Sequence, residues 1–381
     1  MRILGKGKTA QAIKNNYPNS TMYDDSDKEI FDINSDELTV VSPGIPPSNY
    51  LVQNSKNLVS EYDLFNETMP FSIWISGTNG KTTTTQMLQH ILKNKGSVCG
   101  GNIGTPLADL NIKEKIWILE TSSFTLHYTN KAKPNIYILL PISDDHCSWH
   151  GNFREYEKSK LKPLELMSED DIAIIPLKYK DYQTKAKVKY YNSSFDLADI
   201  YNIDIDKINF KEPFLLDSLL ALSVSKILFN EINYRLINSF IQDPHKLEEF
   251  KDKKNRLWVD DSKATNIDAT IQAIKTYKDK KIYLILGGDD KDANLTPLFE
   301  ELTKYNVEIF AIGKNEDKLF SLSNSYKLKL TKSQNLKNAV KKIDLVLDKS
   351  SIALLSPAAA SFDQFNSYKQ RGDKFKEFIN S

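Results

Sequence analysis

The chain has 381 residues, and its 51 lysines and arginines against 50 aspartates and glutamates give a net charge of +1. This balance gives no support to binding of nucleic acid through bulk charge. The sequence has no apolar run long enough to insert into a membrane, no apolar signal segment in MRILGKGKTA and only two cysteines, so we expect a cytoplasmic protein without a disulfide framework.

A first, small unit is expected over residues 1–70. Its predicted elements are a strand over 1–4, a glycine turn over 5–9, a helix over 10–15 and a strand over 38–42, which a proline-rich turn follows. A Gly-x-Gly turn alone is weak evidence for nucleotide binding. It fits a tight strand-to-helix connection equally well.

The next segment predicts a site for nucleotide phosphates. Residues 71–75 read as a buried strand and 82–95 as a helix that Gly96 ends. The turn between them resembles a phosphate loop, but two residues separate its glycines instead of four. Backbone N–H groups and the helix N-terminus would hold ATP phosphates here, with a lysine on the outer phosphates and a threonine hydroxyl on magnesium. The candidate nucleotide-binding residues are Gly77, Thr78, Asn79, Gly80, Lys81, Thr82 and Thr83.

The middle unit, residues 71–243, carries further strands at 116–119, 135–140 and 172–175 and a helix over 153–167. Glu120 ends the first of these strands, on the same rim as the phosphate loop. We expect it to bind magnesium beside Thr82 rather than only to cap the next helix. The lysine-rich stretch 178–189 is expected to be a solvated surface segment.

Two carboxylates and two imidazoles lie within residues 143–151, directly after a predicted strand. That position favours contact with a metal or phosphate over packing. Zinc is not expected, because neither cysteine has a second ligand at zinc-site spacing. Tyr156 and Lys160 follow on one face of a helix, and their spacing by itself indicates little.

A third unit is expected over residues 244–381. Strands at 257–260, 281–286, 307–312 and 352–355 alternate with helices that begin near Asn266, Pro297 and Leu336, and a helix closes the chain. Glycine or serine follows two of these strands, at 287–288 and 356, where α/β folds place ligands. The fold class is therefore α/β with mostly parallel sheets: a small Rossmann-like domain, a central phosphate-loop domain and a C-terminal Rossmann-like domain.

Segments spread over nearly the whole chain carry a family resemblance. They are SPGIP (42–46), GTNGKTT (77–83), GGNIG (100–104), LETSS (119–123), DH (145–146) with YEKSK (156–160), DDSKATN (260–266), LGGD (286–289), LSPAAASFDQF (355–365) and RGD (371–373). Together they resemble the Mur ligase family, in which the short phosphate loop is a hallmark. The DSKATN and SPAAASFDQF segments are similar to the members that add D-glutamate.

The resemblance implies an ATP-dependent ligase of peptidoglycan precursor synthesis. Such enzymes phosphorylate the carboxylate of UDP-N-acetylmuramoyl-L-alanine, and the amine of D-glutamate then attacks the acyl phosphate through a tetrahedral intermediate. Lys81, His146 and Lys160 match the catalytic positions. Thr82 and Glu120 match the ligands of one magnesium ion, and His146 and Lys160 match those of a second, with a carbamate on Lys160 as the oxygen ligand. A monomer is expected.

The resemblance also implies where the substrates bind. The residues that match positions around the UDP group are Lys8, Thr9, Asp24, Ser42 and Asn102. Those that match positions around D-glutamate are Thr265, Lys291, Ser361, Phe362 and Tyr368.

The chain departs from the family at two nucleotide contacts. Pro213 to Asp217 replaces a His-Asn-x-x-Asn run, and His245-Lys246 replaces a His-Arg pair. Asp217, Lys246 and Asp260 are the expected nucleotide contacts there, and Asp260 or Asp261 offers a carboxylate near the expected position of the ribose.

Three alternatives stay open at this point. A ligase for another amino acid or a folylpolyglutamate synthetase shares the Gly-Thr-Asn-Gly-Lys loop. A phosphate-loop kinase or NTPase would move the phosphate without forming an amide. A silent nucleotide-binding scaffold is the third, against which the joint presence of Lys81, Glu120, His146 and Lys160 weighs.

Overall fold

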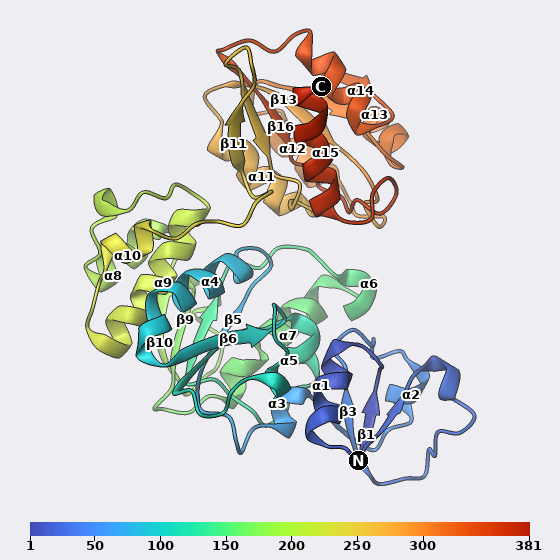
Figure 1. Ribbon diagram of the computed structural model, residues 1–381, viewed down its shortest axis with the longest axis vertical. Helices are drawn as coiled ribbons and strands as arrows, with labels where there is room; N and C mark the ends of the chain where they lie inside the picture. The colour runs from blue at the N-terminus through green and yellow to red at the C-terminus, as the bar shows by residue number, and fades with distance from the viewer. The chain divides into compact units, whose positions relative to one another are not determined.

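The computed structural model describes residues 1–381, which form three sheets and divide into two compact units, Met1–Phe240 and Ile241–Ser381. Two of the sheets lie in the first unit and one in the second (Figure 1). Nearly all strand pairs are parallel, which confirms the expected α/β class. The three domain boundaries drawn from the sequence stay predictions.

The first sheet is small and fully parallel, with strand order β2-β1-β3-β4. Its strands are β1 (Arg2–Leu4), β2 (Thr21–Tyr23), β3 (Leu38–Val41) and β4 (Asn57–Val59). Its helices are α1 (Lys8–Asn16), α2 (Tyr50–Gln53) and α3 (Glu61–Leu64), with the 3₁₀ turn η1 (Asp25–Asp27). The strands β2 and β4 were not predicted, because each has only three residues, which are exposed or half-buried, and this is too short for a recognisable apolar run.

The second sheet is also fully parallel, in the order β10-β9-β8-β5-β7-β6. Its strands are β5 (Phe71–Ser76), β6 (Ser97–Gly101), β7 (Ile116–Glu120), β8 (Ile136–Leu139), β9 (Ile172–Pro176) and β10 (Lys187–Tyr191). The helices around it are α4 (Lys81–Leu92), α5 (Ser123–Tyr128), α6 (Cys147–His150), α7 (Phe153–Leu166), α8 (Ser194–Tyr201), α9 (Phe214–Phe229) and α10 (Tyr234–Asn238). Short 3₁₀ turns are η2 (Lys93–Lys95), η3 (Leu107–Asp109), η4 (Leu177–Tyr179) and η5 (Ile205–Lys207).

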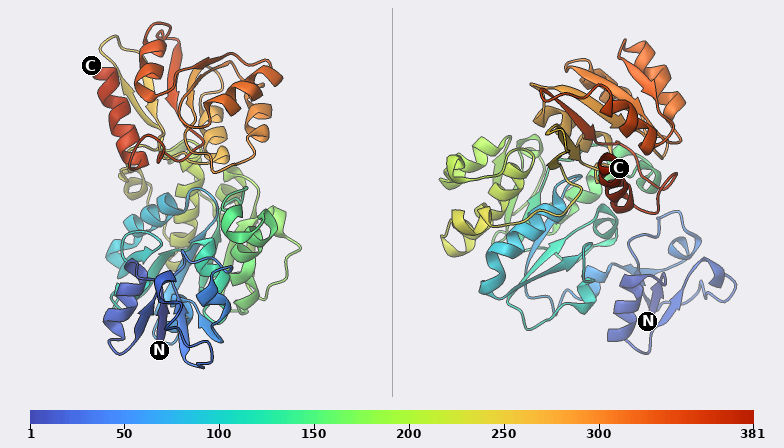
Figure 2. Two further views of the ribbon diagram at one scale, coloured as in Figure 1. Left: turned by 90° about the vertical axis from the view of Figure 1, so that its right-hand side faces the viewer. Right: turned by 45° about the horizontal axis from the view of Figure 1, so that its top comes forward.

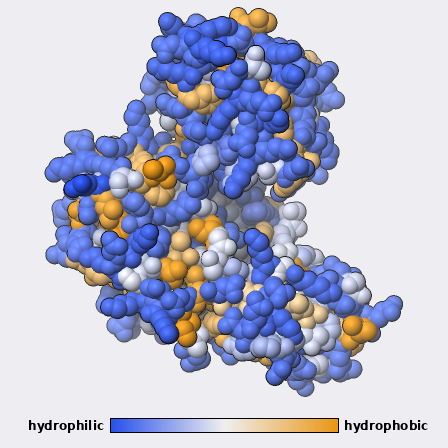
Figure 3. All heavy atoms as spheres, viewed as in Figure 1, coloured by the Kyte–Doolittle hydropathy of each residue, from blue (hydrophilic) through white to orange (hydrophobic).

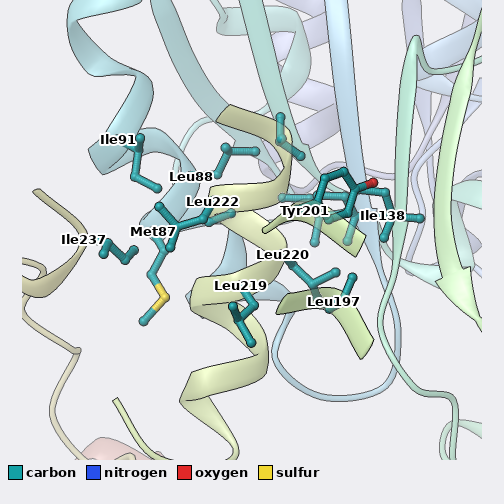
Figure 4. Packing of buried hydrophobic residues seen from close by; sticks show 14 of the residues in the cluster. Met87, Leu88, Ile91, Ile138, Leu197, Tyr201, Leu219, Leu220, Leu222 and Ile237 are labelled. Carbon is teal, nitrogen blue, oxygen red and sulfur yellow. The ribbon is translucent and has the colours of Figure 1, made fainter. Parts of the chain in front are cut away.

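Alternate residues of these strands enter two different cores. Ile73 and Ile75 of β5 pack on one face with α4, α8 and α9, and Trp74 packs on the other with α5 and α7. Figure 4 shows the first core, in which side chains of α4 such as Met87 lie against Leu219 and its neighbours on α9. Because both faces are covered, the strands read as continuous apolar runs.

The second core also contains residues of the small N-terminal sheet and its helix. Ile3, Ile13 and Val40 are fully buried in the same cluster as Trp74 and Trp117 of the central sheet. A shared core of this kind explains why residues 1–240 form one compact unit although they contain two sheets.

The third sheet has the order β11-β12-β16-β13-β14-β15, and only the pair β11 with β12 is antiparallel. Its strands are β11 (Glu248–Lys251), β12 (Leu257–Asp260), β13 (Lys281–Leu286), β14 (Val307–Ala311), β15 (Leu330–Lys332) and β16 (Ser351–Leu355). Helices α11 (Ile267–Thr276), α12 (Thr296–Leu302) and α13 (Glu316–Ser325) pack on one face, and α14 (Leu336–Asp344) and α15 (Tyr368–Asn380) pack on the other (Figure 2).

One prediction about the surface was wrong in part. Residues 187–189, at the end of the lysine-rich stretch, belong to β10, which pairs with β9 as an edge strand of the central sheet. Its lysines point outward while Val188 and Tyr190 are half-buried and Tyr191 is buried. Lysine on an edge strand is common because it discourages pairing with other chains, so the composition resembled a loop.

Hydrophilic residues predominate on the face drawn in Figure 3, and hydrophobic ones appear there in small groups. No helix combines the length and the apolar character that crossing a membrane would require.

Candidate active site

The predicted nucleotide-binding groups follow neighbouring parallel strands of the central sheet. The phosphate loop follows β5, Glu120 ends β7 on one side of it, and the segment of His146 follows β8 on the other. Because the carboxyl ends of parallel strands meet at one edge, these groups are expected to lie together, as ligands do in open α/β sheets.

The phosphate loop is closely packed against its surroundings. Gly77 and Gly80 have positive φ angles of 138° and 84°. A Cβ on Gly77 would lie 2.5 Å from Cβ of Leu140, and one on Gly80 would lie 2.6 Å from Oδ1 of Asp217. Both positions therefore require glycine, and the loop leads directly into the N-terminus of α4, where anions are favoured.

Lys81 folds back over this loop. Its Nζ donates to the carbonyl oxygens of Gly77 and Thr78 at 2.9 and 2.7 Å. Burial lowers the pKa of Lys81, while the charges of Glu120 and Asp145 act in the opposite direction. These two bonds hold the side-chain nitrogen of Lys81 against the phosphate loop.

Three predicted ligand-binding residues are hydrogen-bonded to one another. Oε2 of Glu120 accepts from Oγ1 of Thr82 at 2.7 Å, and Oε1 accepts from Nδ2 of Asn102 at 2.6 Å. The carboxylate of Glu120 is buried and lies between the hydroxyl of Thr82 on α4 and the side-chain amide of Asn102, which follows β6. Hydroxyl and carboxylate oxygens at one point make a donor set that suits Mg²⁺.

Lys160 is only 1% exposed although it is a lysine. Its Nζ donates to the carbonyl of Gly77 at 2.7 Å and to Oγ of Ser76 at 3.4 Å, so it reaches the phosphate loop from α7. Burial, together with the positive charge of Lys81, lowers the pKa of Lys160 well below its usual value. The structure thus places the buried amine of Lys160, with its lowered pKa, beside the phosphate loop.

Tyr156 was not among the predicted site residues, but it joins several of them. Its hydroxyl lies 3.0 Å from Oγ1 of Thr78, and its ring lies 4.8 Å from Nζ of Lys160. Thr78 in turn donates to the carbonyl of Ser143 at 3.0 Å. The four-residue spacing of Tyr156 and Lys160 was the available signal, and it carried no information until the contact with Thr78 was seen.

His146 is the most open of the predicted metal ligands. Its side chain is 44% exposed, and its Nε2 lies 3.7 Å from Oδ2 of Asp145. Its ring packs on Phe124 at 4.8 Å and lies 6.0 Å from the ring of Tyr156. His146 and Lys160 therefore both lie against Tyr156.

The second imidazole of this segment has a structural role. His150 is buried and its Nε2 lies 2.9 Å from Oγ of Ser123. Burial and nearby positive charges, among them Lys160, lower the pKa of His150 to about 3. A neutral, buried imidazole that joins α6 to α5 does not provide the open metal ligand expected from the residue pattern.

Asp217 reaches the phosphate loop from α9. Its Oδ1 accepts from Oγ1 of Thr84 at 2.7 Å and lies next to Gly80. The carboxylate thus packs beside the first turn of α4, so the expected proximity to the nucleotide loop is present. A direct contact with nucleotide stays a prediction.

A cavity of about 550 Å³ in the first unit contains four of the five residues predicted to surround UDP. They are Lys8, Thr9, Ser42 and Asn102. The fifth, Asp24, lies outside the lining and forms an ion pair with Lys6 at 3.0 Å. Glu61, which no motif indicated, also lines the cavity, and its buried carboxylate accepts from the backbone N–H of Ala108 at 3.0 Å.

The D-glutamate candidates follow strands of the third sheet at its carboxyl edge, four of them in loops and Tyr368 as the first residue of α15. Thr265 follows β12, Lys291 follows β13, and the other candidates follow β16: Ser361, Phe362 and Tyr368. Ser361 is buried and its hydroxyl has no hydrogen-bond partner, whereas Thr265 and Lys291 are exposed. Lys263, which the sequence did not single out, lies with Nζ 4.7 Å from the ring of Tyr368.

The remaining nucleotide candidates are Lys246, which precedes β11, and Asp260, the last residue of β12. Nδ1 of His245 is 2.7 Å from Oδ2 of Asp260, which is fully buried and whose Oδ1 accepts from the N–H of Ser262. Asp260 thus bonds within the protein, and its expected ribose contact stays a prediction. Lys246 is paired with Asp243 at 3.1 Å.

Comparisons with known proteins agree with this arrangement. The family model described as Mur ligase middle domain matches residues 75–214. A UDP-N-acetylmuramoylalanine--D-glutamate ligase of Campylobacter jejuni is 50% identical over 99% of this chain and 98% of its own length. The ligase of the same name from Helicobacter pylori is 45% identical over the same shares.

Solved structures show the same fold at low sequence identity. The MurF ligase of Thermotoga maritima in complex with ADP has a TM-score of 0.62 at 15% identity, over 99% of this chain and 93% of its own. The UDP-N-acetylmuramate-alanine ligase MurC of the same organism has a TM-score of 0.60 at 14% identity, over 99% of this chain and 98% of its own.

Proposed function

The chain belongs to the Mur ligase family, and from this premise we propose that it joins D-glutamate to UDP-N-acetylmuramoylalanine in an ATP-dependent reaction. The observation that carries the proposal is the full-length similarity to ligases of that name, together with a phosphate loop that a buried carboxylate and a buried lysine flank at one sheet edge. The reaction is a step of peptidoglycan precursor synthesis.

The chemistry has two bond-forming steps. A carboxylate oxygen of the acceptor attacks the γ-phosphorus of ATP, ADP leaves, and an acyl phosphate forms. The amine of D-glutamate then attacks the acyl carbon, a tetrahedral intermediate collapses, and inorganic phosphate leaves with the loss of a proton from nitrogen. The first step brings a carboxylate toward a polyanion, so charge neutralisation is the main task of the protein.

The residues of the chain meet this task at the carboxyl edge of the central sheet. Backbone N–H groups of the loop and the N-terminus of α4 receive phosphates, and Lys81 supplies a positive charge. The carboxylate of Glu120 is already oriented by Thr82 and Asn102, so little reorganisation is needed when charge develops.

Magnesium fits the donor atoms of Thr82 and Glu120, which are a hydroxyl and a carboxylate oxygen hydrogen-bonded to each other at 2.7 Å. When bound, Mg²⁺ neutralises the phosphates and lets the acceptor carboxylate approach. We propose a second ion at His146 and Lys160. An ammonium cannot ligate a metal, but the neutral amine that burial favours at Lys160 can add to CO₂ and lose a proton, which gives a carbamate with oxygen ligands.

The amino acid is assigned to the third sheet. Its two carboxylates call for cations and hydroxyls, and Lys291, Thr265 and Ser361 supply these groups on three loops of one edge. The unpartnered, buried hydroxyl of Ser361 supports this assignment, because a buried polar group without a partner is costly and is expected to receive a ligand.

ADP release tests the substrate assignment. The purified chain receives ATP, MgCl₂ and UDP-N-acetylmuramoyl-L-alanine, with D-glutamate, L-glutamate, L-alanine, L-lysine or meso-diaminopimelate. We expect release to require the acceptor and to be fastest with D-glutamate. A different best amino acid would contradict the assignment. Release that does not require both the acceptor and an amino acid would indicate a kinase or NTPase, and bound nucleotide without turnover would indicate a scaffold.

The carbamate is tested separately with Lys160→Ala and with Lys158→Ala, an exposed lysine of the same helix, as the matched control. We expect the first variant to lose about 10²- to 10³-fold in kcat and the control to keep its rate. In buffer depleted of CO₂ the wild type should slow and recover on addition of bicarbonate. Normal turnover of Lys160→Ala would refute the role. The monomeric state and the cytoplasmic location stay predictions.

A further inference from the structure

The loop that carries Lys291 has a backbone that needs support from outside. Lys291 and Asp292 both have positive φ angles, 50° and 60°, a region that is unfavourable for residues with a Cβ. Side chains within the loop contribute weak local bonds, from the N–H of Lys291 to Asp289 at 3.3 Å and from the N–H of Asp292 to Asp290 at 3.2 Å. These turns alone do not orient the loop on the sheet.

Two contacts join the loop to the rest of the unit. On one side Asp289 exchanges both backbone hydrogen bonds with Ala360, at 3.0 and 2.9 Å, which places the loop beside Ser361. On the other side Nζ of Lys318, on α13, donates to Oδ2 of Asp290 at 2.8 Å and to the carbonyl of Ala293 at 2.6 Å.

The contact of Lys318 with Asp290 involves a buried carboxylate and several donors. The Asp290 side chain is only 9% exposed, so its carboxylate depends on protein donors rather than on water. Burial acts to raise the pKa of Asp290, but hydrogen bonds from Lys318 and Asn315 hold it below its usual value. Asn315 also accepts from the N–H of Gly288 at 3.0 Å, so the start of the loop and its acid are tied to one helix. One ammonium thus bridges the acid before Lys291 and the carbonyl two residues after it.

We propose that Lys318 and Asp290 form a positioning pair that holds the 289–293 loop so that Lys291 presents its ammonium to a carboxylate of D-glutamate. The inference rests on the proposed function and deepens it. Neither residue of the pair needs to touch the substrate. Its contribution is to remove the freedom of a strained loop before the amino acid binds, which favours binding without altering the phosphoryl transfer.

Steady-state kinetics of Lys318→Met and Asp290→Asn test the pair. We expect each to raise KM for D-glutamate about 10-fold, with kcat and KM for ATP changed less than about 2-fold. The double variant should be no worse than either single variant, because both remove one interaction. Lys318→Arg should restore most of the affinity, since it keeps a donor of the same charge.

Lys332→Met is the matched control. It removes an exposed ion pair with Asp317, the residue next to Lys318 on α13, and should leave KM for D-glutamate unchanged. The proposal is overturned if Lys318→Met leaves KM for D-glutamate within 2-fold of wild type. It is also overturned if kcat and the thermal midpoint fall while KM for ATP rises, which indicates a purely structural role. Absence of D-glutamate-dependent ADP release in the wild type would instead refute the proposed function.

Discussion

The candidate nucleotide site of Met1–Phe240 and the candidate amino-acid site of Ile241–Ser381, called here the first and the second end, hold their side chains in different ways. At the first, the candidate side chains bond to one another or to the phosphate loop, as Thr82 does to Glu120 and Lys160 does to Gly77. At the second, Thr265 and Lys291 are exposed and only the loops that carry them are fastened.

The difference follows from what each end has to do. Stabilising a phosphoryl transfer requires charges that are in place before the reaction, because reorganising them would raise the barrier. Capturing a small amino acid requires only that cations and hydroxyls be reachable, because the ligand completes their hydrogen bonds. We therefore expect substitutions at the first end to lower kcat and substitutions at the second to raise KM.

The largest effect is expected from Glu120→Gln, which tests the preorganised end. Removing the charge while keeping the size should lower kcat about 10²- to 10³-fold and raise the MgCl₂ concentration needed for half-maximal rate. The check is kcat as a function of MgCl₂. Glu114→Gln, before the start of β7, is the control and should behave as wild type. An unchanged kcat of Glu120→Gln at saturating MgCl₂ would contradict the idea that the first end depends on charges that are in place before the reaction.

A second prediction concerns the buried carboxyl group of Glu61 in the first unit and its effect on stability at different pH values. Burial raises the pKa of Glu61 to about 7, although the hydrogen bond from Ala108 acts in the opposite direction. The folded state therefore keeps a proton that the unfolded chain, with an ordinary pKa near 4.3, has released. The resulting stabilisation is present at low pH and is lost as the pH rises through about 7.

Glu61→Gln should remove this dependence. Relative to the variant, the wild type should lose about 2–3 kcal/mol of unfolding free energy between pH 5 and pH 8. Urea unfolding at several pH values measures it, and Glu67→Gln, an exposed glutamate in the same segment, should follow the wild type. Parallel pH curves for wild type and Glu61→Gln would show that the carboxylate is better solvated than its burial implies.

The amino-acid end is tested by Lys291→Met. Losing one cation of an open site should raise KM for D-glutamate about 10-fold while kcat changes less than about 3-fold. Lys314→Met, an exposed lysine on another loop of the same edge, should have no effect. If kcat fell as far as in Glu120→Gln, the two ends would not differ in the way proposed.

The smallest effect is expected from Phe362→Ala. The side chain is 70% exposed, so its removal should leave the thermal midpoint within about 1 °C and change KM for D-glutamate less than about 3-fold. Thermal unfolding and ligation kinetics check both values. A marked loss of affinity would indicate that the ring covers the bound amino acid, which would make this end less open than it is in the structure.

Local features of the site could be predicted from the sequence. The order of strand, glycine turn and helix around Lys81 depends on neighbouring residues, and the structure has the same order in β5 and α4. The short edge strand β10 was missed because its alternate lysines resemble a loop. The contact of Asp217 with Thr84 joins residues 133 positions apart, and no local pattern indicates it.

By itself the sequence determined the α/β class, the phosphate loop and the membership in a ligase family, because apolar runs, glycines and motif residues act over short distances along the chain. Only the tertiary structure decided which polar groups are buried and with what. Lys160 becomes a low-pKa amine because α7 packs it against the phosphate loop, and Asp290 becomes an anchor because α13 brings Lys318 to it. Burial and charge pairing depend on distances between elements, which a linear sequence does not contain.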